Sequence, residues 1–304
     1  MQTNAQLESH MFSKDLLSGK RILVTGGGTG LGKAMSEGFM SLGADVVICG
    51  RRKGVLDDTA KELMDRYPGR KVDAFGVDIR DFNAVDAMVE EVFQSGAPLT
   101  GLINNAAGNF ISRTEDLTPG GFNAIANIVM HGTFYVTHSV GKRWIEKQLP
   151  GSVISILATW VRNGGPYVVP SAMSKAAVNV MTMSLAAEWG HYGIRLNSIA
   201  PGEIPTEGMN ARLSPGQKPG ERAAKANPMG RHGTFADLQN LASFLQSDGS
   251  TWINGETIAL DGAQGLATGG NFYSVMRDWS DADWQKARDL IKGQNDKDRS
   301  QRTS

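Results

Sequence analysis

A glycine-rich turn near the N-terminus constrains the fold of this chain more than any other feature. Residues 25–32 read Thr-Gly-Gly-Gly-Thr-Gly-Leu-Gly; they follow the apolar run Arg21–Val24 and precede a helix-forming stretch, Lys33–Leu42. Such a turn can be a plain connector, but its flanking strand and helix favour a pyrophosphate cradle. Glycines let the backbone approach the anion, and the helix start offers free N–H groups. The candidate phosphate-binding residues are Gly26, Gly28, Thr29, Gly30, Leu31 and Gly32.

Short apolar runs alternate with longer segments of helical periodicity along most of the chain. The predicted strands are Arg21–Thr25, Asp45–Cys49, Val72–Gly76, Gly101–Asn104, Ser152–Ile156, Arg195–Ile199 and Thr257–Leu260. The predicted helices that follow Lys33–Leu42 are Val55–Arg66, Phe82–Gln94, Phe122–Lys147, Lys175–Tyr192 and Phe235–Gln246. This alternation predicts an α/β fold: a single doubly wound parallel sheet, Rossmann-like, with helices on both faces.

The sequence favours one catalytic domain with a short extension at each end. Residues 1–18 are predicted to be an N-terminal extension, 19–268 the dinucleotide-binding catalytic domain, and 269–304 a polar tail with a short helix. In that helix, Trp284, Ala287 and Ile291 would share one apolar stripe. Residues 203–233 are rich in Gly, Pro, Lys and Arg and follow a strand, so we predict a lid-like insertion there.

Charge and cysteine content narrow the possible functions. Lys+Arg and Asp+Glu both number 31, so neither nucleic acid nor a membrane surface is an expected partner. Cys49 is the only cysteine and lies in an apolar run, so we expect an inert buried thiol, no disulfide and no metal site. The sequence has no long apolar stretch and no readable leader, so a cytoplasmic location is the expectation.

Two arginines at the end of the second predicted strand favour one cofactor. In dinucleotide-binding folds an acidic residue at this place hydrogen-bonds the ribose 2′-OH of NAD, whereas an arginine accommodates the 2′-phosphate of NADP. Here Arg51 and Arg52 stand there and no carboxylate does. Solvent-facing charges at a strand end are the alternative, but two guanidiniums close to a glycine turn favour NADPH.

Four short motifs in a fixed order resemble those of the short-chain dehydrogenase/reductase family. They are Thr25–Gly32, Val77–Ile79, Asn104–Gly108 and Pro201-Gly202, and the resemblance covers residues 18–265. It implies that Asp78 and Ile79 hold the adenine and that Asn105 and Ala106 lie in a turn supporting the cofactor. It also implies that residues 201–206 lie along the nicotinamide.

The family's usual catalytic set is a serine, an asparagine and a Tyr-x-x-x-Lys pair. The lysine lowers the pKa of the tyrosine, so that the phenol can give its proton to the substrate oxygen. Lys175 is present here, but Ser171 stands four residues before it, and Ala158 and Thr159 stand at the usual serine position. Ordinary carbonyl reduction by the standard set is therefore not expected.

A closer resemblance, to the 2,4-dienoyl-CoA reductases of this family, accounts for most of the departure. It rests on Asn104–Ser112, Val168–Ala172 with Lys175, Ala187–Gly190 and Trp252–Gly255. It implies catalytic roles for Asn109, Ser171 and Lys175. The implied NADP contacts are Arg51, Asp78, Lys175, Pro201, Gly202 and Ile204, and the implied acyl-CoA contacts are Arg80, Phe110, Thr118 and Arg212.

One position departs from the mitochondrial type of these enzymes, which carries a tyrosine fifteen residues before the lysine. This chain has Trp160 there. An indole can donate a hydrogen bond but has no proton to give to carbon, so we expect Trp160 to line the substrate pocket. The proton donor is either a water held by Lys175 and Ser171 or Tyr167, whose alternative role is to line the acyl pocket.

These inferences predict an enzyme that uses NADPH to reduce a conjugated acyl-CoA in the degradation of unsaturated fatty acids or related compounds. Asn109 would donate a hydrogen bond to the thioester oxygen. The alternatives within the family are a trans-2-enoyl-CoA reductase and a 3-ketoacyl reductase. The alternative of another class is a non-catalytic NADP-binding sensor or assembly subunit. The resemblance also implies a homotetramer that pairs long helices.

Overall fold

The computed structural model describes residues 12–206, 220–267 and 276–302. These residues belong to two units, Met1–Gly265 and Leu266–Ser304, and each is described by itself. The domain boundaries expected from the sequence stay a prediction.

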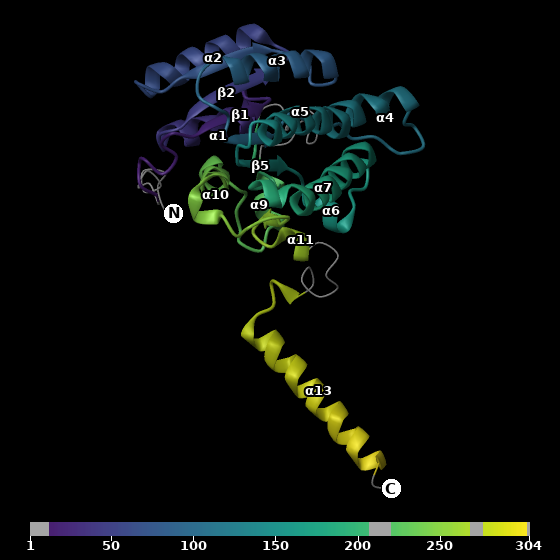
Figure 1. Ribbon diagram of the computed structural model, residues 1–304. Helices are drawn as coiled ribbons and strands as arrows, with labels where there is room; N and C mark the ends of the chain where they lie inside the picture. Colours follow the sequence, from purple (N-terminus) through teal and green to yellow (C-terminus); the bar gives the residue numbers. More distant parts are fainter. Residues whose placement is uncertain (1–11, 207–219, 268–275, 303–304) are drawn as a thin grey trace. The chain divides into compact units, whose positions relative to one another are not determined.

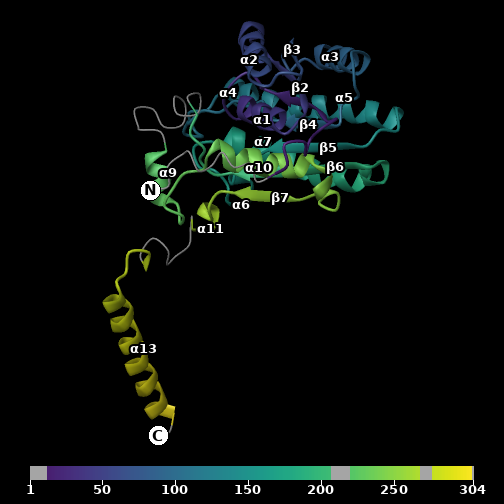
Figure 2. The ribbon, with the colours of Figure 1, turned by 90° about the vertical axis from the view of Figure 1, so that its left-hand side faces the viewer.

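A seven-stranded parallel sheet forms the middle of the first unit, with strand order β3-β2-β1-β4-β5-β6-β7. In Figure 2 the strands follow this order from β3 near the top to β7 at the lower edge of the sheet. The chain reverses direction across the sheet after β3, as expected for a doubly wound fold. The strands are β1 Arg21–Thr25, β2 Asp45–Gly50, β3 Val72–Gly76, β4 Gly101–Asn104, β5 Gly151–Ile156, β6 Ile194–Pro201 and β7 Thr257–Leu260.

Helices cover both faces of the sheet (Figure 1). One buried apolar cluster joins alternate residues of β1, such as Ile22, to helices α1, α2 and α10. The other joins Leu23 to helices α3, α5 and α7. Burial on both faces explains why the strands read as continuous apolar runs. The α-helices among the described residues of this part are α1 Gly30–Ser41, α2 Lys53–Arg66, α3 Phe82–Gln94, α4 Pro119–Ala126, α5 Thr133–Glu146, α6 Trp160–Asn163, α7 Val169–Trp189, α9 Glu221–Ala226 and α10 Phe235–Gln246. Helix α11, Gln264–Ala267, spans the boundary at Gly265.

Four predicted helices differ from the observed ones. The helices expected to begin at Lys33 and Val55 begin at Gly30 and Lys53, and two others differ more. The helix expected over Phe122–Lys147 begins at Pro119 and is interrupted by a π-helical turn, Asn127–Gly132. Gly132 packs so closely there that a Cβ atom would lie 2.7 Å from the side chain of Ile79. The helix expected to open at Lys175 begins at Val169 instead, because a proline is tolerated in the first turn of a helix.

In the described part of the second unit, α13 spans Asp281–Arg302. The short helix expected in the tail is therefore wrong in length. Its start is fixed by reciprocal hydrogen bonds between Ser280 and Asp283, the pattern of a capping box. The rings of Trp279 and Trp284 meet edge to face beside this start, with centroids 4.8 Å apart.

Candidate active site

The carboxyl ends of the parallel strands bring the predicted site residues to one edge of the sheet. The glycine turn follows β1, Arg51 follows β2 and Asp78 follows β3. Asn105 follows β4, and Gly202 follows β6. Ligands of open α/β sheets bind at this edge, where the strand order reverses.

Close packing explains why the turn between β1 and α1 is made of glycines. A Cβ atom on Gly32 would lie 2.3 Å from the carbonyl oxygen of Gly26, so the helix start and the turn can meet only without side chains. Gly26 and Gly30 also have positive φ angles, which glycine adopts without strain. Thr29 stands at the N-cap position of α1 but its side chain makes no capping hydrogen bond, so the first N–H groups of the helix can bind an anion.

A threonine that the sequence interpretation did not single out supports this turn. The backbone N–H groups of Asn105 and Ala106 both donate to Oγ1 of Thr25, each at 3.0 Å. The amide of Asn105 donates in return to the carbonyl oxygen of Thr25 at 2.9 Å. Asn105 and Ala106 therefore hold the turn in place through Thr25. A threonine as the last residue before a glycine turn is the signal that would have pointed to it.

The basic residues after β2 face the acidic residue after β3. Arg80 donates from Nε to Asp78 at 3.0 Å, and this bond, helped by the charge of Arg51, holds the pKa of Asp78 below its usual value. Arg51 and Arg52 are exposed, and among the described residues neither guanidinium has a hydrogen-bond or ion-pair partner. Ile79 is buried against the π-helical turn.

Helix α7 places Lys175 and Ser171 on one buried face, beside the end of β5. They are one helical turn apart, and their exposed fractions are 8% and 3%. The ammonium of Lys175 donates to the carbonyl oxygen of Ile156, the last residue of β5. Burial lowers the pKa of Lys175 to about 8. An amine with a pKa this close to neutral can pass protons under ordinary conditions.

The loop after β4 carries the predicted substrate residues Asn109 and Phe110 toward the start of α4. The ring of Phe110 lies against Gly121, whose N–H group donates to Oγ1 of Thr118 at 3.1 Å. Phe110 and Thr118 are thus brought together. Asn109 accepts a hydrogen bond from the N–H group of Phe110 at 2.9 Å through Oδ1, so its amide donor is directed elsewhere.

Trp160 and Tyr167 lie on either side of the turn that connects α6 to α7. A Cβ atom on Gly165 would lie 3.0 Å from the indole of Trp160, so the turn packs directly on that ring. Tyr167 has a φ angle of 64° and a side chain that is 63% exposed.

The segment predicted as a lid closes at its base. The N–H group of Gly233 donates to the carbonyl oxygen of Glu203 at 2.9 Å, which joins the two ends of the insertion. Ile204 is buried at this base, and Gly202 donates to the carbonyl oxygen of Leu260 at the end of β7. Arg212 lies outside the described residues.

Comparison with known sequences and structures decides the family. Residues 26–264 match the family described as enoyl-(acyl carrier protein) reductase. The chain is a member of the short-chain dehydrogenase/reductase family. It is an oxidoreductase, and members of this family bind a nicotinamide dinucleotide.

Two relatives have names that state a reaction. A Caenorhabditis elegans protein named as a probable 2,4-dienoyl-CoA reductase producing (3E)-enoyl-CoA is 42% identical over 93% of both chains. A Bacillus subtilis protein named as a probable 2,4-dienoyl-CoA reductase producing (2E)-enoyl-CoA is 40% identical over 81% of this chain and 97% of its own.

A solved structure agrees with the family. A short-chain dehydrogenase from Bacillus anthracis is 40% identical, with a TM-score of 0.73 over 81% of this chain and 96% of its own.

The described residues fit the dinucleotide that this family binds. The uncapped start of α1 would hold the pyrophosphate, and Arg51 and Arg52 lie at the strand end that receives the adenosine ribose. Gly30 faces Thr206, because a Cβ atom on Gly30 would lie 3.6 Å from that side chain. The base of the insertion therefore lies beside the cradle, where it can cover a bound cofactor.

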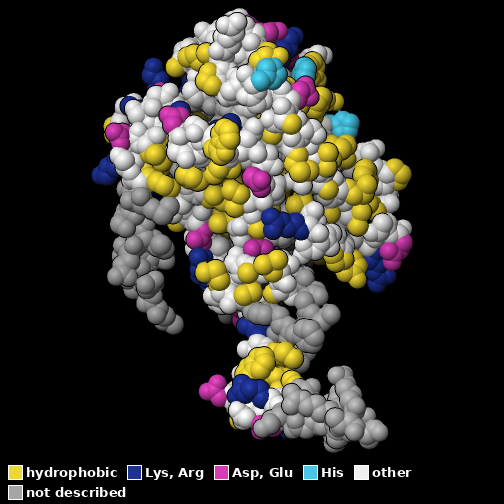
Figure 3. Space-filling view, turned by 60° about the horizontal axis from the view of Figure 1, so that its bottom comes forward, with side chains coloured by type: hydrophobic (Ala, Val, Ile, Leu, Met, Phe, Trp, Pro, Cys, Tyr) yellow, Lys and Arg dark blue, Asp and Glu magenta, His cyan; other side chains and the backbone are white. Residues whose placement is uncertain are grey.

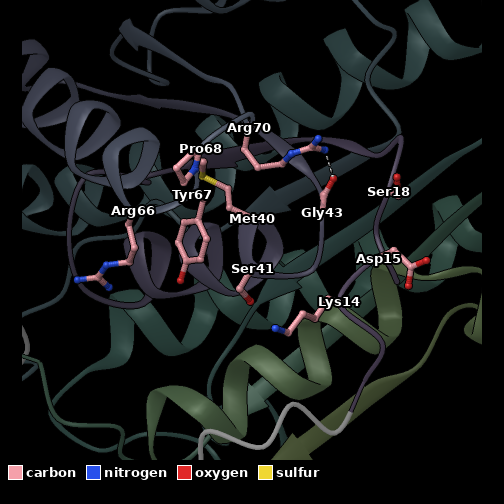
Figure 4. A pocket seen from close by; sticks show the side chains of 10 residues that line it. All are labelled: Lys14, Asp15, Ser18, Met40, Ser41, Gly43, Arg66, Tyr67, Pro68 and Arg70. Atoms are coloured by element: carbon pink, nitrogen blue, oxygen red, sulfur yellow. Dashed lines mark hydrogen bonds between the residues drawn. The ribbon is translucent and has the colours of Figure 1, made fainter.

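The pocket shown in Figure 4 lies near the amino ends of β2 and β3, because its residues include those that connect α1 and α2 to these strands. The candidate site lies at the carboxyl ends of the strands. The volume of the pocket is about 420 Å³, and it lies between the C-terminal ends of α1 and α2 and residues 14–18. Its arginines already have protein partners: Arg70 donates to the carbonyl oxygen of Gly43 at 2.6 Å, and Arg66 pairs with Glu37. The pocket therefore plays no part in the dinucleotide site.

Three further findings concern metals, thiols and membranes. Within residues 12–206, 220–267 and 276–302, no group of three or more His, Cys, Asp or Glu side chains is placed to hold a metal ion. Burial raises the pKa of Cys49 to about 12, so its thiol stays protonated. In the same described part of the chain, no helix has the length and apolar character needed to cross a membrane.

Proposed function

We propose that this protein reduces a 2,4-dienoyl-CoA with NADPH. The observation that carries the proposal is the buried pair Ser171 and Lys175 on α7. Carbonyl reductases of this family have a tyrosine at the position of Ser171. A serine hydroxyl is too weak an acid to protonate a ketone oxygen by itself, but it can hold a water next to an amine. The names of the relatives point to the same substrate class.

NADPH is the proposed cofactor because of the charges after β2. The 2′-phosphate is a dianion at neutral pH, and Arg51 and Arg52 offer two exposed forks of N–H donors that no described acidic residue engages. When bound, the cofactor supplies a hydride to C5, the far end of the conjugated system.

The residues of the chain then act on the charge that reaches the thioester oxygen. Asn109 donates to that oxygen from its amide, a contribution of about 3 kcal/mol for a donor aimed at an oxyanion. Phe110, Thr118 and Trp160 surround the acyl part, while Arg80 and Arg212 are the proposed contacts of the CoA phosphates. A water held by Ser171 and Lys175 returns the proton to carbon.

The same arrangement favours one product. C2 is next to the thioester carbonyl and C4 is two bonds further away, so a donor held beside that oxygen reaches C2 first. Protonation at C2 leaves the double bond between C3 and C4, which gives a (3E)-enoyl-CoA. This is the product in the name of the C. elegans relative.

A substrate panel tests the proposal. NADPH oxidation is measured with a dienoyl-CoA, a trans-2-enoyl-CoA, a 3-ketoacyl-CoA and a free ketone, each at matched concentration. We expect the dienoyl-CoA to be preferred by at least about tenfold in kcat/KM. The 3-ketoacyl-CoA and the free ketone need an acid at the ketone oxygen, and the enoyl-CoA lacks the C4–C5 double bond that receives the hydride. Preference for the enoyl or ketoacyl substrate, or tight NADPH binding without any turnover, would contradict it.

We also propose that the protein is a homotetramer. Large apolar side chains stand exposed on α5 and α7, namely Phe134, Met173, Val180 and Met183, and the indole of Trp252 is 98% exposed. On the face shown in Figure 3, charges of both signs are scattered among apolar groups. We expect sedimentation at four times the chain mass of 32.6 kDa, and smaller species for Met183→Glu. A monomer at micromolar concentration would contradict the proposal.

A cytoplasmic location stays a prediction.

A further inference from the structure

The turn between α6 and α7 contains Tyr167 in a backbone conformation that is unfavourable for tyrosine. Tyr167 has a φ angle of 64°, in the left-handed region that β-carbon atoms disfavour. Gly165, two residues earlier, packs on the indole of Trp160, and Val168 donates to the carbonyl oxygen of Gly165 at 3.3 Å. Trp160 thus packs against the turn, and the side chain of Tyr167 is exposed.

The backbone of the same tyrosine ties two parts of the site together. The N–H group of Ser112 donates to the carbonyl oxygen of Tyr167 at 2.9 Å. Ser112 lies in the loop between β4 and α4 that carries Asn109 and Phe110, whereas Tyr167 leads into α7, which carries Ser171 and Lys175. The backbone of Tyr167 therefore links the loop that carries Asn109 to the start of α7.

The side chain of Tyr167 adds little to the packing of the described residues. It is 63% exposed, and among the described residues its hydroxyl has no hydrogen-bond partner. A glycine would adopt the same backbone without strain. A large aromatic side chain at a strained and exposed position of a candidate site points to a role that begins when a ligand arrives.

We propose that Tyr167 is a specificity-determining residue, whose ring covers the thioester end of the bound acyl chain while its carbonyl group positions the Asn109 loop. This inference rests on the proposed function and assigns Tyr167 binding rather than proton donation. The ring contacts the carbons nearest the thioester, because the two elements that flank it carry Asn109 on one side and Ser171 on the other.

Two substitutions of Tyr167 test the role of the ring. Tyr167→Gly is expected to raise KM for a dienoyl-CoA at least tenfold, with kcat within threefold, an unchanged Kd for NADPH, and a Tm within about 3 °C of the wild type. The KM increase is expected to be equal for six-carbon and ten-carbon dienoyl-CoA. Tyr167→Phe is expected to keep KM within twofold and the pH profile of kcat unchanged.

A matched pair at Ser112 tests the backbone tie. Ser112→Pro removes the N–H donor and is expected to raise KM and to lower kcat, because the Asn109 loop is released. Ser112→Ala keeps the N–H group and is expected to behave as the wild type. A folded Ser112→Pro protein with wild-type kinetics would show that the tie is not needed.

The outcomes separate this inference from the function beneath it. A wild-type protein that turns over no dienoyl-CoA would contradict both the proposed function and the role of Tyr167. An active wild type with an unchanged KM in Tyr167→Gly overturns the inference alone, as does a KM increase confined to the longer substrate. A hundredfold loss of kcat in Tyr167→Phe with a shifted pH profile makes Tyr167 the acid, and also overturns it.

Discussion

Lys175→Met is expected to lower kcat/KM for a dienoyl-CoA by at least about a thousandfold, because proton transfer and cofactor positioning depend on one ammonium group. The lysine is buried at the end of β5, next to Ser171, and methionine fills a similar volume without a charge. Steady-state NADPH oxidation measures the effect. Activity within tenfold of the wild type would remove Lys175 from the mechanism.

The same substitution is expected to make the folded chain more stable at neutral pH. The pKa of Lys175 is lowered from 10.5 to about 8 by burial, so its charged form is disfavoured in the folded state. That penalty, about 3 kcal/mol, is fully present below pH 8 and disappears as the pH rises from 8 to 10.5. The methionine variant avoids it but loses the hydrogen bond to Ile156, which costs about 1 kcal/mol at every pH.

Urea unfolding at pH 7 and pH 9.5 measures this difference. The stability advantage of Lys175→Met over the wild type should shrink by about 2 kcal/mol between the two values. Lys142→Met is the matched control, since Lys142 is an exposed lysine on α5 and should show no such trend. A stability advantage that is the same at both pH values would show that burial does not lower the pKa of Lys175.

Replacing both arginines after β2 is expected to reverse the preference for NADPH. In the double variant Arg51→Ala, Arg52→Ala, the Kd for NADPH should rise by about a hundredfold or more, because each charge-assisted contact to phosphate contributes about 1.5–3 kcal/mol. The Kd for NADH should stay within threefold. Fluorescence titration of the reduced cofactors gives both constants.

A neighbouring lysine provides the control for this prediction. Lys53, at the start of α2, is exposed and pairs with Asp57, so Lys53→Ala should leave the ratio of the two constants unchanged. An equal loss of NADPH and NADH binding in the arginine variant would show that these residues stabilise the strand end. An unchanged ratio would mean that other groups read the 2′-phosphate.

The central strands β1 and β4 could be predicted from the sequence, because burial on both faces leaves a run of apolar residues that a glycine or polar residue ends. The partly buried strands β3 and β7 could be predicted from their place in the alternation with helices. β1, β3, β4 and β7 have the predicted bounds. The helices were harder to predict where packing against distant residues decides. Gly132 meets Ile79 from another part of the chain, and this contact accompanies a π-helical turn that no local pattern marks.

The location of the site could also be predicted, since parallel strands all end at one edge. Its internal contacts could not. The bond between Arg80 and Asp78 and the packing of Gly165 on Trp160 depend on side-chain directions that a sequence does not contain. The positive φ angle of Tyr167 could not be predicted either, because residues other than glycine rarely adopt it.

Transfer of deuterium from NADPH labelled at the hydride position tests the central claim most directly. The labelled cofactor is incubated with a 2,4-dienoyl-CoA, and the product is analysed by mass spectrometry and NMR. We predict an enoyl-CoA with one deuterium at C5, a double bond between C3 and C4, and a solvent proton at C2. Deuterium at C3, or no transfer of label to the acyl chain, would contradict it.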